Sequence, residues 1–176
     1  AGDAITTGNY NVVVGKGALT EITTASNITA IGYISLKDNT TGAGNTAVGA
    51  YSAQNTTTGD QIVAIGYSAL GANTTGDDNT ALGYDSLGAN TTGNENTAVG
   101  RDAGNAITTG SNNVCMGYDA GDTITTGDNS VILGSGADIS AGDGSGANVL
   151  GRNVSGAAGY TTLGSGSDDI RAAHGT

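Results

Sequence analysis

A 17-residue repeat runs through most of this chain and constrains its fold more than any other feature of the sequence. The glycines that close each Asn-Thr-Ala-Val-like segment recur at every seventeenth position, at Gly15, Gly32, Gly49, Gly66, Gly83, Gly100, Gly117, Gly134 and Gly151. The glycine of the Thr-Thr-Gly segments keeps the same interval, with Ala25 standing in once. After Gly151 the interval shortens to thirteen, with the next equivalent glycine at Gly164. A fixed period over this many units predicts a solenoid.

The length and the letters of the unit predict that the solenoid is built from strands. The unit is too short for the helix pairs of the common α-solenoids. It is rich in Thr, Val, Ile, Asn and Gly, which favour short strands and tight turns. We therefore predict an all-β fold, a parallel β-solenoid or β-roll of about nine coils. Each coil would hold two short strands, roughly Ile/Asn-Thr-Thr and Asn-Thr-Ala-Val, spaced about 4.8 Å from those of the next coil.

The rhythm also predicts how the chain is divided. Residues 1–151 should form the regular solenoid, residues 152–164 a shorter irregular coil, and residues 165–176 a tail or a linker to a region outside this sequence. The chain has 32 glycines and no Pro, Phe or Trp, so an aromatic core of the usual globular kind is excluded.

Two apolar columns occupy alternate positions of the Asn-Thr-Ala-Val segment, and side chains on a strand alternate between its faces. The column one residue before each glycine is predicted to be the core: Val14, Ile31, Val48, Ile65, Leu82, Val99, Met116, Leu133 and Leu150. The column two residues before it would then point outward: Val13, Ala30, Ala47, Ala64, Ala81, Ala98, Cys115, Ile132 and Val149. A strand that is apolar on both faces is normally covered on both. We therefore predict that the alanine-rich column is an oligomer interface.

The corner after the strand shows a compensating exchange. Where the corner has Leu70 or Leu87, the residue three positions later is Asn73 or Asn90, whereas Gly104 and Gly121 are followed by Ile107 and Ile124. Either large side chain would fill the same interior volume, because cores are packed to nearly uniform density.

Charge and composition exclude several classes of partner. The net charge is −11 with only five basic residues, which argues against nucleic acids and against anionic membrane surfaces. No apolar run reaches the length of a membrane-spanning helix, so membrane insertion is not predicted. The single cysteine excludes an intrachain disulfide and a cysteine-based metal cluster.

Few residues suggest chemistry, and we predict no enzyme, no catalytic site and no cofactor. Asp85, Asp102 and Asp119 share one column on successive coils, where they could bind Ca²⁺ or form a solvated acidic face. A further column is a candidate for facing a receptor through sugar stacking, or serves only to pack the turns: Tyr33, Tyr67, Tyr84 and Tyr118.

A threonine ladder supports a different function, the binding of ice or of another crystal surface. Its members repeat at strand spacing, at Thr6, Thr23, Thr40, Thr57, Thr74, Thr91, Thr108 and Thr125. However, adjacent threonines face opposite ways, which leaves one outward threonine per coil instead of a flat double row.

The repeat also resembles a known family. The motif Asn-Thr-Ala-Val/Ile/Leu-Gly, as in Asn45–Gly49, Asn79–Gly83 and Asn96–Gly100, is similar to the YadA-like head repeats of trimeric autotransporter adhesins. It is also similar to the 17-residue variants in phage tail fibres that end in an intramolecular-chaperone peptidase. The resemblance covers about Gly8 to Gly164. It implies a left-handed β-roll, three copies of which pack side by side.

Together these features predict a non-enzymatic, extracellular fibre or adhesin segment. It would project from a virion as part of a tail fibre, or from a bacterial cell, as a homotrimer that binds a host surface glycan or protein receptor. The receptor, the choice between phage fibre and cellular adhesin, and the flanking domains stay open at this point.

Overall fold

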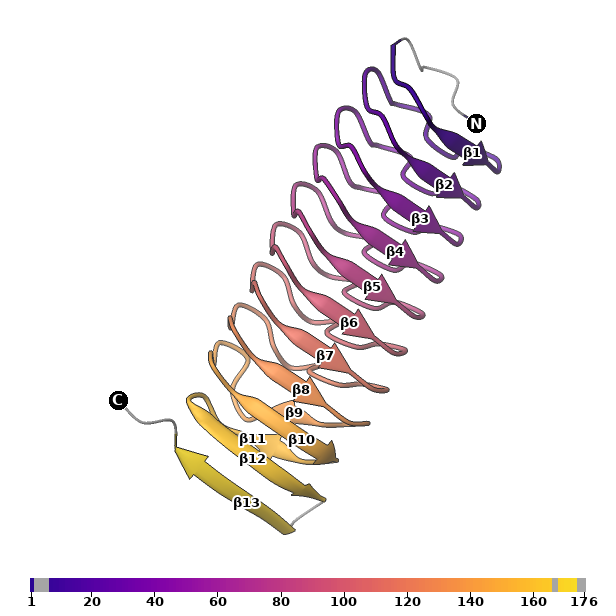
Figure 1. The fold of residues 1–176 in the computed structure, drawn as a ribbon. Helices are drawn as coiled ribbons and strands as arrows, with labels where there is room; N and C mark the ends of the chain where they lie inside the picture. The colour runs from indigo at the N-terminus through magenta and orange to yellow at the C-terminus, as the bar shows by residue number, and fades with distance from the viewer. Residues whose placement is uncertain (2–6, 166–167, 174–176) are drawn as a thin grey trace.

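The chain forms an elongated stack of similar coils, as Figure 1 shows. A computed structural model describes residue 1 and residues 7–165 and 168–173. Each coil adds one strand to a single 11-stranded sheet, and all neighbours in this sheet are parallel except the last pair. No helix occurs among the described residues. The predicted all-β, parallel solenoid of about nine coils is confirmed.

The strands are short and regularly spaced. The 11-stranded sheet consists of β1 (Val12–Val14), β2 (Thr29–Ile31), β3 (Thr46–Val48), β4 (Val63–Ile65), β5 (Thr80–Leu82), β6 (Thr97–Val99), β7 (Val114–Met116), β8 (Val131–Leu133), β10 (Asn148–Arg152), β12 (Tyr160–Ser165) and β13 (Asp168–Ala173). A second sheet pairs β9 (Asp138–Ile139) with β11 (Ser155–Gly156).

The register of the sheet follows the sequence period. Thr80 pairs with Thr97 and Ala81 with Ala98, so neighbouring strands are offset by one full repeat. Between β10 and β12 the offset is shorter, with Asn148 opposite Thr161, as the early return of glycine at Gly164 predicted. The described part of the segment predicted as a tail or linker contributes β13, which runs antiparallel to β12.

The coils from β1 to β7 have one regular strand each, so the prediction of two is wrong for them, and only the coils of β8 and β10 add a second short strand, β9 and β11. The Thr-Thr segment does bond to the next coil, but the N–H groups of Thr74 and Thr75 both donate to the carbonyl oxygen of Thr91, at 2.9 and 3.3 Å. In a regular parallel ladder each carbonyl would accept from one N–H group. The shared acceptor shows that the chain turns here instead of continuing as a strand.

The predicted alternation along the strand is present, but the assignment of its two sides was wrong. The alanine-rich column predicted as an interface points into the coil. Its buried members, each at most 1% exposed, are Ala30, Ala47, Ala64, Ala81, Ala98, Cys115, Ile132 and Val149, and the half-buried Val13 packs against them. The column predicted as core points outward. Its exposed members are Val14, Ile31, Ile65, Met116 and Leu150, and Val48, Leu82, Val99 and Leu133 are half-buried.

The narrowness of the coil explains the reversal. The opposite wall comes so close that a Cβ atom on Gly104 would lie 3.6 Å from the Sγ of Cys115. That wall already brings buried leucine or isoleucine side chains into the interior, such as Leu70, Leu87 and Ile107. At native packing density, only small side chains fit on the inner side of the strand in these coils, whereas Ile132 and Val149 fill it in the last ones.

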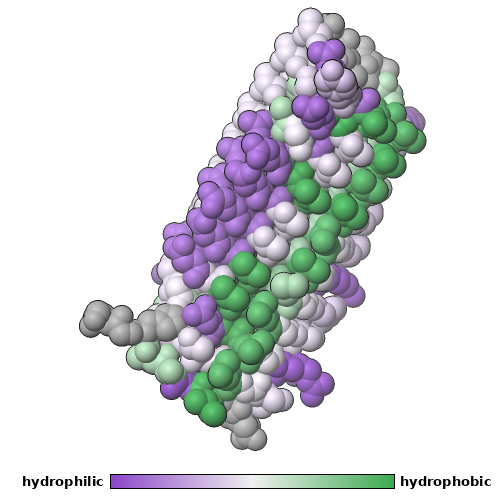
Figure 2. Space-filling view, viewed as in Figure 1, coloured by the Kyte–Doolittle hydropathy of each residue, from purple (hydrophilic) through white to green (hydrophobic). Residues whose placement is uncertain are grey.

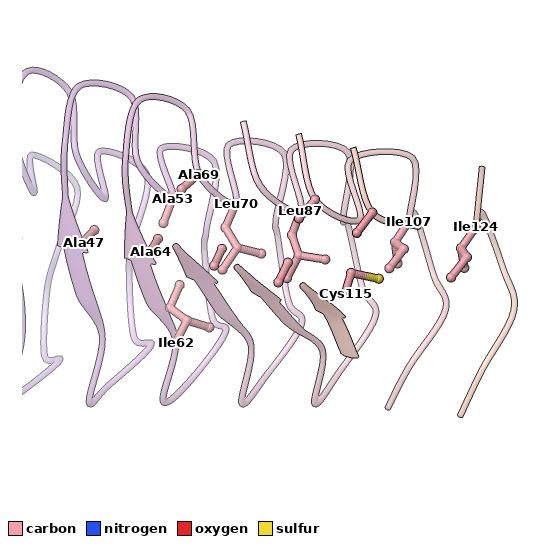
Figure 3. Close-up of a cluster of buried hydrophobic side chains, with 14 of the residues drawn as sticks. Ala47, Ala53, Ile62, Ala64, Ala69, Leu70, Leu87, Ile107, Cys115 and Ile124 are labelled. Atoms are coloured by element: carbon pink, nitrogen blue, oxygen red, sulfur yellow. The ribbon is translucent and has the colours of Figure 1, made fainter. Parts of the chain in front are cut away.

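The predicted exchange at the corner is confirmed. Leu70, Leu87, Ile107 and Ile124 are all fully buried in the interior, as Figure 3 shows. A Cβ atom on Gly104 would lie 3.1 Å from the Cδ1 of Ile107 and 3.1 Å from the Cδ2 of Leu87. Isoleucine therefore occupies the volume that a leucine at the corner fills in other coils.

Buried asparagines link the coils through their amide groups. The Nδ2 of Asn79 donates to the carbonyl of Gly93 at 2.7 Å, and its Oδ1 accepts from the backbone N–H of Asn96 at 2.9 Å. Asn96 repeats both contacts with Gly110 and Asn113. Both ends of each amide are thereby satisfied inside a narrow coil, where an unpaired polar group would be destabilising.

Candidate functional site

The most distinctive surface is an apolar band that runs along the sheet, which we call the outer strand face. Figure 2 shows it as a green band along the length of the molecule. Its apolar members are Val12, Val14, Ile31, Val48, Val63, Ile65, Leu82, Val99, Val114, Met116, Val131, Leu133, Leu150 and Leu163. Val14 is 56% exposed and Leu150 52% exposed. Contiguous apolar surface of this extent marks an interaction site on a soluble protein.

The outer strand face is hollowed near its C-terminal end. A shallow depression of about 310 Å³ opens where the last coil shortens, and it is lined by Val131, Leu133, Asn148, Val149, Leu150, Thr161 and Leu163. An apolar side chain of a partner would fit such a depression better than a polar ligand, because most of the lining is aliphatic.

A ladder of rings and one guanidinium, which we call the aromatic ladder, borders this face over six consecutive coils. It consists of Tyr33, Tyr51, Tyr67, Tyr84, Arg101 and Tyr118. Adjacent ring centroids lie 5.3, 5.5 and 5.3 Å apart from Tyr33 to Tyr84. The Cζ of Arg101 lies 5.6 Å from the ring centroid of Tyr84 and 5.5 Å from that of Tyr118. The cation therefore bridges two rings and keeps the ladder continuous.

The sequence predicted four members of the aromatic ladder and missed two. Tyr33, Tyr67, Tyr84 and Tyr118 lie in one exposed column as expected. Arg101 occupies the same column, and this position could have been found by reading the column through the repeat. Tyr51 lies one position later, beside Ala50, and its ring packs edge to face against those of Tyr33 and Tyr67.

Carboxylates border the aromatic ladder on its other side. The Nε of Arg101 lies 2.9 Å from Oδ2 of Asp102. Tyr118 bonds to Asp119, and this hydrogen bond and the negative charge raise the pKa of the Tyr118 phenol. Asp85 accepts a hydrogen bond from the Nδ2 of Asn105 at 3.3 Å. Each carboxylate of the predicted acidic column therefore has a neighbour of its own.

An acidic depression lies behind this column, but it does not supply a set of ligands for the predicted calcium ion. The depression has a volume of about 440 Å³ and is lined by Ala89, Asp102, Asn105, Ala106, Asp119 and Asp122. Among the residues that the structure describes, no three His, Cys, Asp or Glu side chains are grouped so that they could hold a metal ion. Calcium at Asp85, Asp102 and Asp119 stays a prediction.

Two carboxyl groups share a hydrogen bond at the end of the acidic depression. Burial, followed by the hydrogen bond to Asp122, raises the pKa of Asp138 from 3.8 to about 6. The backbone N–H of Ile139 donates to Oδ1 of Asp138 at 2.8 Å, and this contact acts in the opposite direction. Asp138 therefore titrates within the acidic range in which carboxyl-dependent stability changes.

The threonine ladder bonds within the stack. The hydroxyl of Thr74 donates to the carbonyl of Thr91 at 2.9 Å, and Thr91 repeats the contact with Thr108 at 3.0 Å. The exposed hydroxyls belong to the next residue of each coil, such as Thr75 and Thr92. Thr6 lies outside the described residues.

Cys115 is structural. It is 1% exposed, and burial raises the pKa of its thiol to about 12. A protonated, inaccessible thiol reacts slowly because the thiolate is the nucleophile.

Comparisons with protein-family models, curated proteins and solved structures found no match. In the described part of the chain, no helix could cross a membrane.

Proposed function

We propose that this chain is a non-enzymatic fibre or adhesin segment that assembles side by side with copies of itself and mediates attachment to a host surface. The outer strand face carries this proposal, because a continuous apolar band repeats on every coil and a soluble chain would normally cover it. The proposed interface is therefore the column Val14 to Leu150, on the strand side opposite the alanine-rich column.

Self-assembly suits this face because the same spacing repeats on every copy. Covering the exposed part of one such side chain contributes on the order of 1 kcal/mol. Summed over the nine coils that carry it, this contribution can offset an association cost of about 4–15 kcal/mol. The number three and the left hand of the coil come from the resemblance to trimeric adhesin heads.

The surfaces left for a receptor are the remaining walls of each coil. They repeat the acidic column and the exposed threonines at the spacing of the coils. Such a surface suits many weak contacts, and several copies of a weak contact can strengthen binding about 10²–10⁴-fold without a deep pocket. A host glycan or protein on an extracellular surface, met by a virion fibre or a bacterial adhesin, is the proposed partner.

Attachment can be tested on arrays of immobilised neutral glycans, acidic glycans and extracellular-matrix proteins. The wild-type chain is compared with Leu82→Asp, which places a charge on the outer strand face, and with the control Thr75→Asp on an exposed turn. We expect distributed binding that falls at least tenfold for Leu82→Asp and little for Thr75→Asp. Binding that is equally strong for a monomeric Leu82→Asp chain, or catalytic conversion of a probe, would contradict the proposal.

The alternative of ice or crystal binding has weaker support. One exposed threonine per coil, as at Thr75 and Thr92, repeats at strand spacing. The other threonine of each pair donates its hydroxyl to the next coil. A single file of hydroxyls offers a poorer lattice match than two parallel files.

A further inference from the structure

Each strand of the outer strand face is bordered by two flanking positions, one before it and one after it. We call the residues two positions before each strand the leading flank: Tyr10, Asn27, Gly44, Gln61, Asp78, Glu95, Asn112, Asn129 and Gly146. The trailing flank is the position after each repeat glycine: Lys16, Tyr33, Ala50, Tyr67, Tyr84, Arg101, Tyr118, Ser135 and Arg152. The trailing flank includes most of the aromatic ladder.

The backbone holds the leading flank in one repeated conformation. Every residue of this flank has a left-handed backbone, with φ between 56° for Gln61, Asp78 and Glu95 and 71° for Gly44. The strands lie side by side across the long axis of the molecule, one in each coil, as Figure 1 shows. The two flanks of one strand therefore lie at nearly the same height on opposite borders of the outer strand face.

Strand β6 carries opposite charges on its two flanks, and each of the other eight strands carries at most one charged flank residue. Strand β6 carries Glu95 on one border and Arg101 on the other, and β5 carries Asp78 and Tyr84. The strands β2, β4 and β7 set an amide against a phenol, and β3 sets Gly44 against Ala50. In these nine pairs, no strand places two acids or two bases on its flanks. Opposite charges on the two borders of one face are complementary across a junction between copies of the chain.

Within one chain, the members of such a pair face each other across the width of the sheet. Arg101 lies six positions after Glu95, with the strand Thr97–Val99 between them, and the two residues are separated by at most about 20 Å of backbone. Both side chains are exposed, and the guanidinium of Arg101 is paired with Asp102. Among the described residues, no ion pair involves Glu95.

We propose that the outer strand face is covered by further copies of this chain, parallel and in register, so that the leading flank of one copy lies against the trailing flank of the next. Glu95 of one copy then meets Arg101 of its neighbour, and the proposal rests on the self-assembly proposed above. Such head-to-tail contacts close into a ring around an axis parallel to the stack. An antiparallel pair would set leading flank against leading flank, which contains no cation for Glu95 to meet.

Charge reversal tests the pairing. The association of wild-type chain, Glu95→Lys, Arg101→Glu and the double variant is measured by sedimentation equilibrium at low salt. We expect each single variant to raise the midpoint concentration of assembly about tenfold or more, because every junction then holds two like charges. The double variant should return to within about threefold of wild type, and added salt should reduce these differences. Glu21→Lys, at an exposed acid of the opposite wall, is the matched control.

Cross-linking tests the same geometry without relying on charge. Chains carrying Glu95→Cys are mixed with chains carrying Arg101→Cys, both with Cys115→Ala, then reassembled and oxidised. We expect disulfides between positions 95 and 101 of different chains and none between two positions 95. Disulfides joining two positions 95, or a double charge variant that stays as weak as the single ones, would overturn the flank pairing while leaving self-assembly intact. A wild-type chain that is monomeric would overturn both proposals.

Discussion

Cys115 and Gly121 share one volume inside the coil, because a Cβ atom on Gly121 would lie 2.5 Å from the Sγ of Cys115. The alanine-rich column is alanine in every coil from Ala30 to Ala98, and Cys115 is the first larger residue that follows. The corner opposite Cys115 has glycine where other coils have leucine. The same exchange occurs further on, where a Cβ atom on Gly156 would collide with the Cγ2 of Val149. In these two places a larger side chain on the strand stands against a glycine on the opposite wall.

Gly121→Ala should destabilise the fold through this contact. We expect a loss of about 2–4 kcal/mol in the free energy of unfolding, from left-handed backbone strain together with overpacking. Gly146→Ala is the control, since its φ of 69° is close to the 67° of Gly121 and nothing lies within 4 Å of its Cβ position. The free energy of unfolding of both variants and of Cys115→Ala/Gly121→Ala is measured with denaturant. The double variant should regain the part of the loss that is due to overpacking. Equal losses for Gly121→Ala and Gly146→Ala would contradict the shared volume.

Ala81 and Leu82 should respond in opposite ways to substitution. Ala81→Leu forces a large side chain into the filled interior and should lower the free energy of unfolding of the single chain by about 1–3 kcal/mol or more. Leu82→Asp should leave each coil folded, as judged by circular dichroism, but should prevent assembly. Loss of folding in Leu82→Asp with a stable Ala81→Leu chain would restore the original assignment of the two sides.

The Asp122–Asp138 pair should make stability depend on pH. The folded chain holds the Asp138 proton more tightly than the unfolded chain, because its pKa rises from 3.8 to about 6. The contribution of this group to stability is therefore greatest below about pH 4 and declines as pH rises to about 6. Asp138→Asn should raise the unfolding temperature at pH 7 but change it little at pH 4. Asp143→Asn, at an exposed acid of the same coil, is the control, and an equal rise there would contradict the prediction.

Removal of one whole coil should preserve the fold. Deletion of residues 74–90 takes out one complete repeat and joins equivalent positions of neighbouring coils. Because the stability of a repeat protein is roughly additive over neighbouring units, the shorter chain should still fold and assemble. A deletion that is one residue shorter or one residue longer should not, since a slip of one residue turns the alanine-rich column outward. Circular dichroism and sedimentation of the three deletions distinguish these outcomes.

The features that depend only on the repeat period could be predicted from the sequence. The spacing of Gly83 and Gly100 determines which residues pair between coils, and the step from Gly151 to Gly164 predicts the shorter last coil. The exchange between Leu87 and Ile107 was also predictable, because two sites that compensate for each other must be close together.

Which side of the strand faces the interior of the coil could not be deduced from alternation. Alternation shows that Ala81 and Leu82 lie on opposite sides, but the space inside the coil decides which side is inner. That space depends on how closely the opposite wall approaches, and the small size of the alanine-rich column was the available clue. Tyr51 was missed because it lies one position outside the tyrosine column, and only its ring contacts with Tyr33 and Tyr67 place it in the aromatic ladder.

The mass of the wild-type chain in solution tests the central claim most directly. If the outer strand face is covered by copies of the chain, sedimentation equilibrium at micromolar concentration should give three times the chain mass of 16.9 kDa. The species should be elongated and should dissociate when Leu82 is replaced by Asp. A folded, stable species of 16.9 kDa under the same conditions would contradict the account.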